Sequence, residues 1–356
     1  MSAIIADTGG LAFAEVTDGA VRRLHPIPWE LTTDRSAVAA AATLHGGGLS
    51  IVARIAASNV PLLIGSADGT DLRPAPGIPG AQAHADVHGV SRDGTVLATA
   101  ERRTAHGYRH SAHFLRPEAA TWSDLEVPDT FRLLHVVGSD GDTVYLTGGA
   151  EDASEATDRE QKPALFAADL SKGVVTEVGL PVSGPAVPLR DRLRWNSCDP
   201  AFGLLGRGTF HRNVLVTSSS HGHAFEYEVL HAVDRASGLW ATARLRRDDH
   251  LAEQWVAADR TVHGLTGFGD LWTSDAGGAW RHTDFRDRLT RVLGSNTKSI
   301  GLQAAAFTGD RLLLATTQAV VECAADGTDL RILCRRDEGA PRVLSFLRPP
   351  AGTLPG

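Results

Sequence analysis

Residues 66–73 read SADGTDLR, and almost the same string returns at residues 324–331 as AADGTDLR. Asp-Gly is a typical tight hairpin turn, because glycine adopts positive φ without steric cost and the aspartate side chain bonds nearby backbone. Each copy lies between the third and fourth of four short apolar strands. The two copies therefore indicate a repeated four-stranded unit.

The repeat extends along most of the chain. A polar turn followed by a short apolar strand recurs near residues 46, 93, 140, 212, 259 and 309, in steps of about 47 to 49 residues except for one of about 71. A period of this size with short strands indicates a propeller or a solenoid. We predict an all-β fold, a seven-bladed β-propeller of four-stranded antiparallel blades, with six or eight blades as alternatives.

The predicted blades form a single domain spanning residues 1–356. Pairing the C-terminal strand with three N-terminal strands would close the ring and remove exposed sheet edges. The long step reflects insertions at 149–161 and 184–198, of which the first carries five acidic residues in thirteen. The expected blades are 1–30 plus 341–350, 37–78, 84–127, 131–183, 199–247, 252–287 and 298–337.

Bulk composition excludes several classes of protein. The net charge is −7 and no basic face is visible, which argues against nucleic-acid binding. The N-terminus lacks the apolar core of a signal peptide, and no segment is long and apolar enough to span a membrane. Three cysteines cannot all pair, and a hairpin at residues 326–327 would keep Cys323 from facing Cys334. We expect a cytoplasmic protein, a monomer or weak dimer, that binds neither membrane nor nucleic acid.

Residues 271–280 read LWTSDAGGAW. The segment resembles the Asp box of BNR-repeat propellers, Ser/Thr-x-Asp-x-Gly-x-x-Trp, through Thr273, Asp275, Gly277 and Trp280. The resemblance covers eight residues of one blade and extends to sialidase-like and photosystem-assembly-like propellers. It implies a structural turn on the face opposite any active site, with the tryptophan packed between blades. The sequence lacks the Arg-Ile-Pro segment of sialidases, so we do not expect that activity.

Loops on the other predicted face carry the candidate site. We expect a catalytic set of His221, His223, His110 and Tyr227, with substrate-binding residues His84, Arg194 and Trp195. His250 falls on the same predicted rim. Residues 264–269, GLTGFG, are interpreted as a close-packed turn and not as a dinucleotide motif, because no helix follows them.

Three interpretations of this rim stay open. A histidine oriented by an aspartate can act as a general base. His221 and His223, one residue apart on an extended segment, can hold a divalent metal, although no spacing matches a zinc signature. The histidines can also simply be solvated or cap loop backbone.

The function that we favour is small-molecule binding by an enzyme of lyase, cyclase or hydrolase type, with a His-rich site at the channel mouth. No cofactor is required by the sequence. The alternative is a non-catalytic propeller that scaffolds a protein partner, which the acidic insertion at 149–161 would suit.

Overall fold

The fold was analysed in a computed structural model of the chain. The statements below concern the residues that the structure describes, namely 2–7, 10–27, 39–45, 48–54, 62–66, 73–79, 84–90, 95–104, 107–116, 119–127, 131–140, 142–150, 162–180, 205–221, 227–275, 278–294, 300–308, 310–337 and 340–347.

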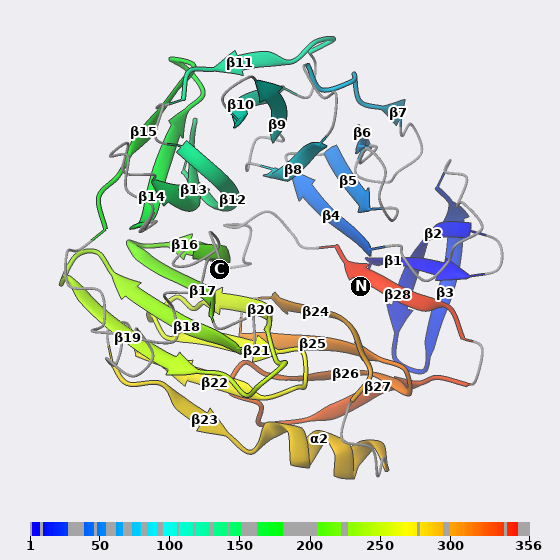
Figure 1. The fold of residues 1–356 in the computed structure, drawn as a ribbon. Helices are drawn as coiled ribbons and strands as arrows, with labels where there is room; N and C mark the ends of the chain where they lie inside the picture. Colours follow the sequence, from blue (N-terminus) through cyan, green and yellow to red (C-terminus); the bar gives the residue numbers. More distant parts are fainter. Residues whose placement is uncertain are drawn as a thin grey trace. The chain divides into compact units, whose positions relative to one another are not determined.

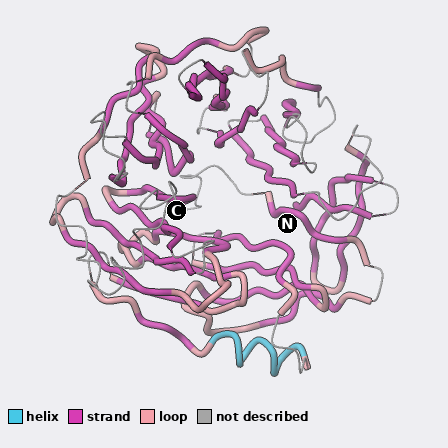
Figure 2. The backbone as a smooth tube through the Cα atoms, in the orientation of Figure 1, coloured by secondary structure: helices cyan, strands magenta, loops and turns pink. Residues whose placement is uncertain are grey.

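The described strands form seven four-stranded, mostly antiparallel sheets, which fits a propeller. Figures 1 and 2 show that strands dominate the described part of the chain and that helix α2 follows β23. By contacts the chain separates into two compact units, residues 1–101, 114–122 and 284–356 in the first and residues 102–113 and 123–283 in the second.

Three complete sheets belong to the first unit. One has the order β28-β1-β2-β3, with strands Arg342–Phe346, Ser2–Asp7, Gly10–Thr17 and Ala20–Pro26. The next contains β4 to β7, which are Ala39–His45, Gly48–Arg54, Leu62–Ser66 and Arg73–Pro74. The third contains β24 to β27, which are Leu302–Thr308, Arg311–Thr316, Ala319–Ala324 and Arg331–Arg335.

Three further sheets belong to the second unit. Strands β12 to β15 are Phe131–Asp140, Thr143–Ala150, Lys162–Asp169 and Val174–Glu177. Strands β16 to β19 are Leu205–His211, Val214–His221, Tyr227–Asp234 and Leu239–Arg244. Strands β20 to β23 are Leu251–Val256, Val262–Thr266, Leu271–Ser274 and Arg281–Thr283.

One sheet has residues in both units, with the order β11-β10-β9-β8. Its strands β8 to β11 are His84–Val90, Val96–Thr104, Gly107–Leu115 and Ser123–Leu125.

The two ends of the chain share a sheet, as the repeat predicts. Strand β28 pairs antiparallel with β1, and Ala3 lies opposite Phe346 (Figure 1, red beside blue). The buried face of this sheet packs against the sheet of β24 to β27, and Ile5, Phe346 and Leu313 belong to one apolar cluster. The C-terminal strand is therefore an integral part of the first unit's core.

Turn chemistry explains why the strands end where they do. Arg212 and Asn213 join β16 to β17 with φ of 50° and 64°, as a two-residue turn matched to the strand twist requires. The β14–β15 and β18–β19 turns each place a glycine in the left-handed region, Gly173 at 71° and Gly238 at 75°. The amide of each glycine donates to the carbonyl of the aspartate four residues earlier, at 2.8 Å.

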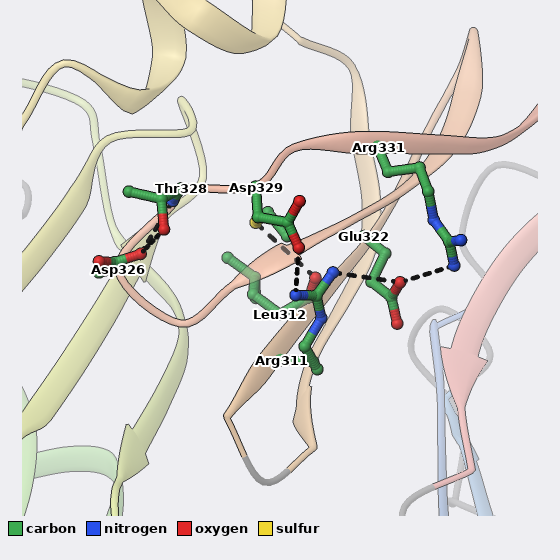
Figure 3. A network of polar contacts seen from close by, with 8 residues as sticks. Arg311, Leu312, Glu322, Asp326, Thr328, Asp329 and Arg331 are labelled. Atoms are coloured by element: carbon green, nitrogen blue, oxygen red, sulfur yellow. Dashed lines mark hydrogen bonds and ion pairs between the residues drawn. The ribbon is translucent and has the colours of Figure 1, made fainter.

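The second SADGTDLR-like string forms the expected hairpin turn between β26 and β27. Asp326 Oδ1 accepts from the hydroxyl and amide of Thr328, at 2.6 and 2.9 Å, and Gly327 has φ of 78° (Figure 3). Beside the turn, Arg311 donates to Asp329 and Glu322 (Figure 3). The first copy, at residues 66–73, lies mostly outside the described residues.

The Asp-box-like segment forms the turn between β22 and β23. The amide of Gly278 donates to the Asp275 carbonyl at 2.7 Å, and the Ser274 hydroxyl lies 2.7 Å from the Gly278 carbonyl. Trp280 packs on a cluster that spans two sheets, and its indole N–H donates to the Ala241 carbonyl of β19 at 3.2 Å. Gly277 lies outside the described residues, and membership of the BNR family stays a prediction.

Helix α2, Phe285–Leu293, was not expected from the repeat. Its buried side chains are Phe285, Leu289 and Leu293, spaced four residues apart, which is the pattern of an amphipathic helix. Gly294 ends the helix in the left-handed conformation, with φ of 70°. This signal is present in the sequence, but the repeat assigned the segment to a blade and a loop. None of the helices in the described part of the chain is long and apolar enough to cross a membrane.

Cys323 and Cys334 are buried free thiols, as expected. Val320 lies opposite Cys334 and Glu322 lies opposite Arg331, so the two thiols occupy different levels of the hairpin. Burial raises the pKa of the Cys323 thiol to about 12 and also raises the pKa of Cys334. Cys198 lies outside the described residues.

Candidate functional site

Polar side chains gather in the second unit where the ends of two neighbouring sheets meet. We call this group the Asp270 cluster, and it consists of Glu228, Arg246, Asp249, His250, Asp270, Trp272 and His282. Its members come from β18, from the segment between β19 and β20, from the β21–β22 turn, and from β22 and β23. All of these segments belong to one compact unit.

The β21–β22 turn supplies the framework. The Gly269 amide donates to the Thr266 carbonyl at 2.9 Å, and the Asp270 amide donates to the Thr266 hydroxyl at 3.0 Å. Gly269 has φ of 87°, which favours glycine. This is the close-packed turn that the sequence predicts for residues 264–269, and it positions Asp270 at the start of β22.

A second close approach fixes His250. The Gly267 amide donates to the His250 carbonyl at 2.9 Å, and a Cβ built on Gly267 would lie 2.4 Å from the His250 ring. A side chain at Gly267 would therefore require the imidazole to shift. The contact joins the loop before β20 to the β21–β22 turn.

Asp249 and Glu228 tie the same segments together. Asp249 is 3% exposed, and its Oδ1 accepts from the amides of His250 and Phe268 at 2.9 and 3.0 Å. Glu228 Oε2 accepts from the amide of Leu251 at 2.9 Å. Two carboxylates thus hold the loop before β20 between β18 and the β21–β22 turn.

Asp270 is the centre of the cluster. Its side chain is 4% exposed, and its Oδ2 lies 3.1 Å from Arg246 Nε while its Oδ1 lies 3.4 Å from His282 Nε2. The Arg246 side chain is 56% exposed and the His282 side chain is 37% exposed. A buried carboxylate therefore orients two cationic or ionisable groups that reach solvent.

An aromatic wall stands beside the imidazole. Trp272 lies directly opposite His282 across β22 and β23, with ring centroids 5.0 Å apart. Trp272 Nε1 and Asp249 Oδ2 are buried and have no hydrogen-bond partner among the described residues. Buried polar atoms in native proteins are nearly always paired with protein or ordered water, so these two atoms retain unused hydrogen-bonding capacity.

The cluster has the parts needed for acid–base chemistry. An imidazole within reach of a buried carboxylate can accept or donate a proton. An exposed guanidinium beside it binds carboxylate or phosphate groups, and an aromatic ring covers an apolar face of a ligand. Among the described residues, no group of three or more His, Cys, Asp or Glu side chains is arranged to hold a metal ion.

The sequence-predicted site residues lie in several places. His223, Arg194 and Trp195 fall outside the described residues. His221 and Tyr227 are paired in the backbone register at the end of the β17–β18 hairpin. His110 lies on β10 and His84 on β8. The side chains of these four residues are not described, so their roles stay predictions.

The backbone does connect part of the expected rim. Glu228 follows Tyr227 and bonds the amide of Leu251, which follows His250. Of the residues predicted to lie on the rim, His250 belongs to the Asp270 cluster and Tyr227 is adjacent in sequence to its member Glu228. Sequence reasoning missed Asp270 and His282 because they are twelve residues apart, and only pairing of β22 with β23 brings them together. The alternation of polar residues on these two short strands is too brief a signal to predict the pair.

No protein-family model matches the sequence, and no curated protein matches it significantly. Solved structures do resemble the fold. A puromycin hydrolase is similar with a TM-score of 0.50 and 16% identity over 94% of this chain and 52% of the hydrolase. An ulvan lyase, solved with a GlcA(1-4)Rha3S saccharide, is similar with a TM-score of 0.51 and 8% identity over 94% of this chain and 89% of the lyase.

These likenesses support a β-propeller-type fold and concern the fold alone. The chain spans about half the length of the puromycin hydrolase, and 42% of a prolyl endopeptidase that it also resembles at a TM-score of 0.48. Identities between 8% and 16% leave the chemistry of this chain to be argued from its own residues.

Proposed function

We propose that this chain is a small-molecule-binding β-propeller, and that the Asp270 cluster is its ligand site. The favoured ligand is a small hydroxylated molecule that carries a carboxylate or phosphate group. The favoured activity is general acid–base chemistry of lyase or hydrolase type, with His282 as the proton-transfer group. We further infer that the seven sheets form one closed ring, which the β28–β1 pairing supports.

The observation that carries the proposal is the shared carboxylate of Asp270. The buried carboxylate of Asp270 lies 3.1 Å from Arg246 and 3.4 Å from His282, and both of these side chains stay partly exposed. A ligand anion can then approach Arg246 from solvent while the imidazole of His282 stays within reach of the same molecule. This is the arrangement expected of a positioned base beside an anion clamp.

The aromatic ring in the cluster favours a ligand with a flat apolar face. The ring of Trp272 provides the flat apolar surface on which a sugar ring packs. Sugar acids are therefore the first compounds to test, and an acidic saccharide is also the ligand in the structure of the similar ulvan lyase.

The test measures binding of a panel of uronates and sugar phosphates by calorimetry, with the intact chain and with Arg246→Gln. The matched control is Arg247→Gln, because Arg247 is adjacent in sequence, its side chain is 74% exposed, and its Nε lies 3.9 Å from the exposed carboxylate of Asp248. We expect Arg246→Gln to weaken binding about tenfold or more and Arg247→Gln to change it less than about threefold. Equal affinity of the two variants would overturn the assignment of the site.

Catalysis is tested separately from binding. His282→Gln is expected to lower turnover of a bound compound by about 100-fold while leaving its affinity within about threefold, since a general base contributes roughly 10² to 10⁴ in rate. Unchanged turnover would remove His282 from the mechanism and leave a binding protein.

The residues predicted from sequence form a second arm of the experiment. His221→Ala and His223→Ala, with metal analysis of the purified protein, test whether the β17–β18 end adds a metal or an imidazole to the site. A stoichiometric metal lost in either variant supports the metal interpretation. If ligand affinity is unaffected in both variants, the proposed site is confined to the Asp270 cluster.

The alternative function is a scaffold for a protein partner. It is favoured by the acidic insertion at 149–161, most of which lies outside the described residues. Capture of a defined partner by the intact chain, lost when the insertion is removed, together with no binding of any compound in the panel, would favour the scaffold.

A further inference from the structure

A second group of side chains, away from the Asp270 cluster, has the geometry of an activated nucleophile. Ser111 and His113 lie on β10, and Asp124 lies on β11. Ser111 Oγ is 2.8 Å from His113 Nε2, and His113 Nδ1 is 2.8 Å from Asp124 Oδ1. All three residues belong to the second compact unit.

The strand places the serine and the histidine together. Residues two apart on a strand point to the same face, so Ser111 and His113 share one side of the sheet. His113 is 5% exposed, Ser111 is half-buried, and the Asp124 side chain is 84% exposed. The imidazole is therefore held by packing and by two hydrogen bonds, while the serine stays within reach of solvent.

The hydrogen bonds determine the tautomer. A carboxylate only accepts hydrogen bonds, so His113 Nδ1 carries the hydrogen that Asp124 accepts. Nε2 is then the free acceptor in the neutral ring, and the Ser111 hydroxyl donates to it. This is the order nucleophile, base and orienting carboxylate, which is recognised by geometry whatever the fold or the order in the chain.

We propose that Ser111 is a nucleophilic serine activated by His113 and Asp124, and that it takes small esters as substrates. Ser111 Oγ attacks the ester carbonyl carbon while His113 Nε2 accepts the hydroxyl proton. The C–O bond to the leaving alcohol then breaks, and the alkoxide receives that proton from His113. Water attacks the acyl-serine in the same way, so one ester and one water give one acid and one alcohol.

Esters are the favoured class because they need less activation than amides. An ester carbonyl is more electrophilic than an amide carbonyl, and an alkoxide is a better leaving group than an amide ion. A serine–imidazole pair can therefore act on an ester with modest stabilisation of the oxyanion. The site lies on the body of a sheet, so the scissile group has to be small and reachable at the surface beside Asp124. The proposal is independent of the Asp270 cluster, because the two sites share no residue.

The test is labelling of the intact chain with a fluorophosphonate probe, followed by mass spectrometry of the labelled peptide. We expect one probe per chain, on Ser111, and no label in Ser111→Ala. The matched control is Ser171→Ala, because Ser171 is exposed and its hydroxyl bonds Asp169 at 2.6 Å without a histidine. Label on other serines only, or none at all, would overturn the proposal.

A second variant separates activation from structure. Asp124 is exposed, so Asp124→Asn is expected to fold and to lower the rate of probe labelling and the kcat for p-nitrophenyl acetate at least tenfold, with KM within about threefold. The pH profile of labelling should also change, since the orienting carboxylate is gone. Labelling of Ser111 at the wild-type rate and pH profile in this variant would show that the three residues do not act together, and would overturn the proposal.

Discussion

Replacing Asp234 with alanine is expected to cost about 3 kcal/mol of folding free energy. Asp234 ends β18 and is 4% exposed. Its carboxylate accepts from the Ala236 amide at 2.9 Å, the Ser237 hydroxyl at 2.8 Å and Arg260 Nη2 at 2.6 Å. It therefore holds the β18–β19 turn and joins it to the β20–β21 turn of the next sheet.

The magnitude follows from these contacts. A hydrogen bond to a charged group contributes about 1.5–3 kcal/mol. The Arg260 side chain is 39% exposed, so its ion pair is screened and contributes roughly 0.5–1 kcal/mol. The two local hydrogen bonds act on one turn and are not additive, which gives about 2 kcal/mol for them and about 3 kcal/mol in total.

Urea unfolding at pH 7 measures the loss, and Asp275→Ala is the matched control. Asp275 occupies the corresponding turn of the next sheet, but its side chain is 75% exposed and lies 3.4 Å from Arg281. The control should change the unfolding free energy by less than about 0.5 kcal/mol. If the Asp234 variant loses less than about 1 kcal/mol, or no more than the control, the reasoning from burial and contacts is refuted.

The same residue gives a pH dependence with a definite sign. Burial alone raises the pKa of Asp234, but the hydrogen bonds from Ser237 and Ala236 and the charge of Arg260 outweigh it, so the pKa lies below its usual value. Stability from this carboxylate is present above the unfolded-state pKa of about 3.9 and is lost as pH falls through the lower folded-state value. The difference between wild type and variant should stay constant from about pH 7 to 5 and shrink below about pH 4.

Three further outcomes test the fold. Burial raises the pKa of Cys323 to about 12, and Cys334 is buried as well. At most one of the three thiols should therefore react with Ellman's reagent at pH 8 in the folded protein, and all three should react after unfolding. Fast reaction of two thiols in the folded protein would contradict this. Phe346→Ala should cost about 3–5 kcal/mol in urea unfolding, because the ring is 2% exposed in the core beside β1, and a loss below 1 kcal/mol would show that β28 is not docked. Gly138→Ala should lower the free energy of unfolding in urea by about 1–3 kcal/mol, because a Cβ would lie 2.4 Å from the Phe210 carbonyl oxygen. If the variant is as stable as the wild type, β12 can move away from β16.

Much of the fold could be predicted from the sequence because its signals are local. Asp-Gly and Arg-Asn turns between short apolar runs mark hairpins, and their spacing gives the four-stranded unit. The pairing of β28 with β1 followed from counting strands, since three N-terminal strands lacked a fourth. Helix α2 was missed because the repeat assigned its residues elsewhere, although Phe285, Leu289 and Leu293 follow a helical period.

The candidate sites were less predictable because their members meet across strands. His282 approaches Asp270 only through the register of β22 and β23, and His113 approaches Asp124 only through the alignment of β10 with β11. Histidine count along loops pointed to His250 and to the end of the β17–β18 hairpin, but it carried no information on which carboxylate each imidazole would contact.

The sequence by itself determined the all-β class, the four-stranded repeat and the joining of the two chain ends, because turn geometry and strand periodicity are encoded within a few residues. Only the tertiary structure decided which polar groups share an environment. Asp270 is buried between Arg246 and His282, and Ser111 is hydrogen-bonded to an imidazole that Asp124 orients. Burial and cross-strand register set those contacts, and neither can be obtained from the spacing of residues along the chain.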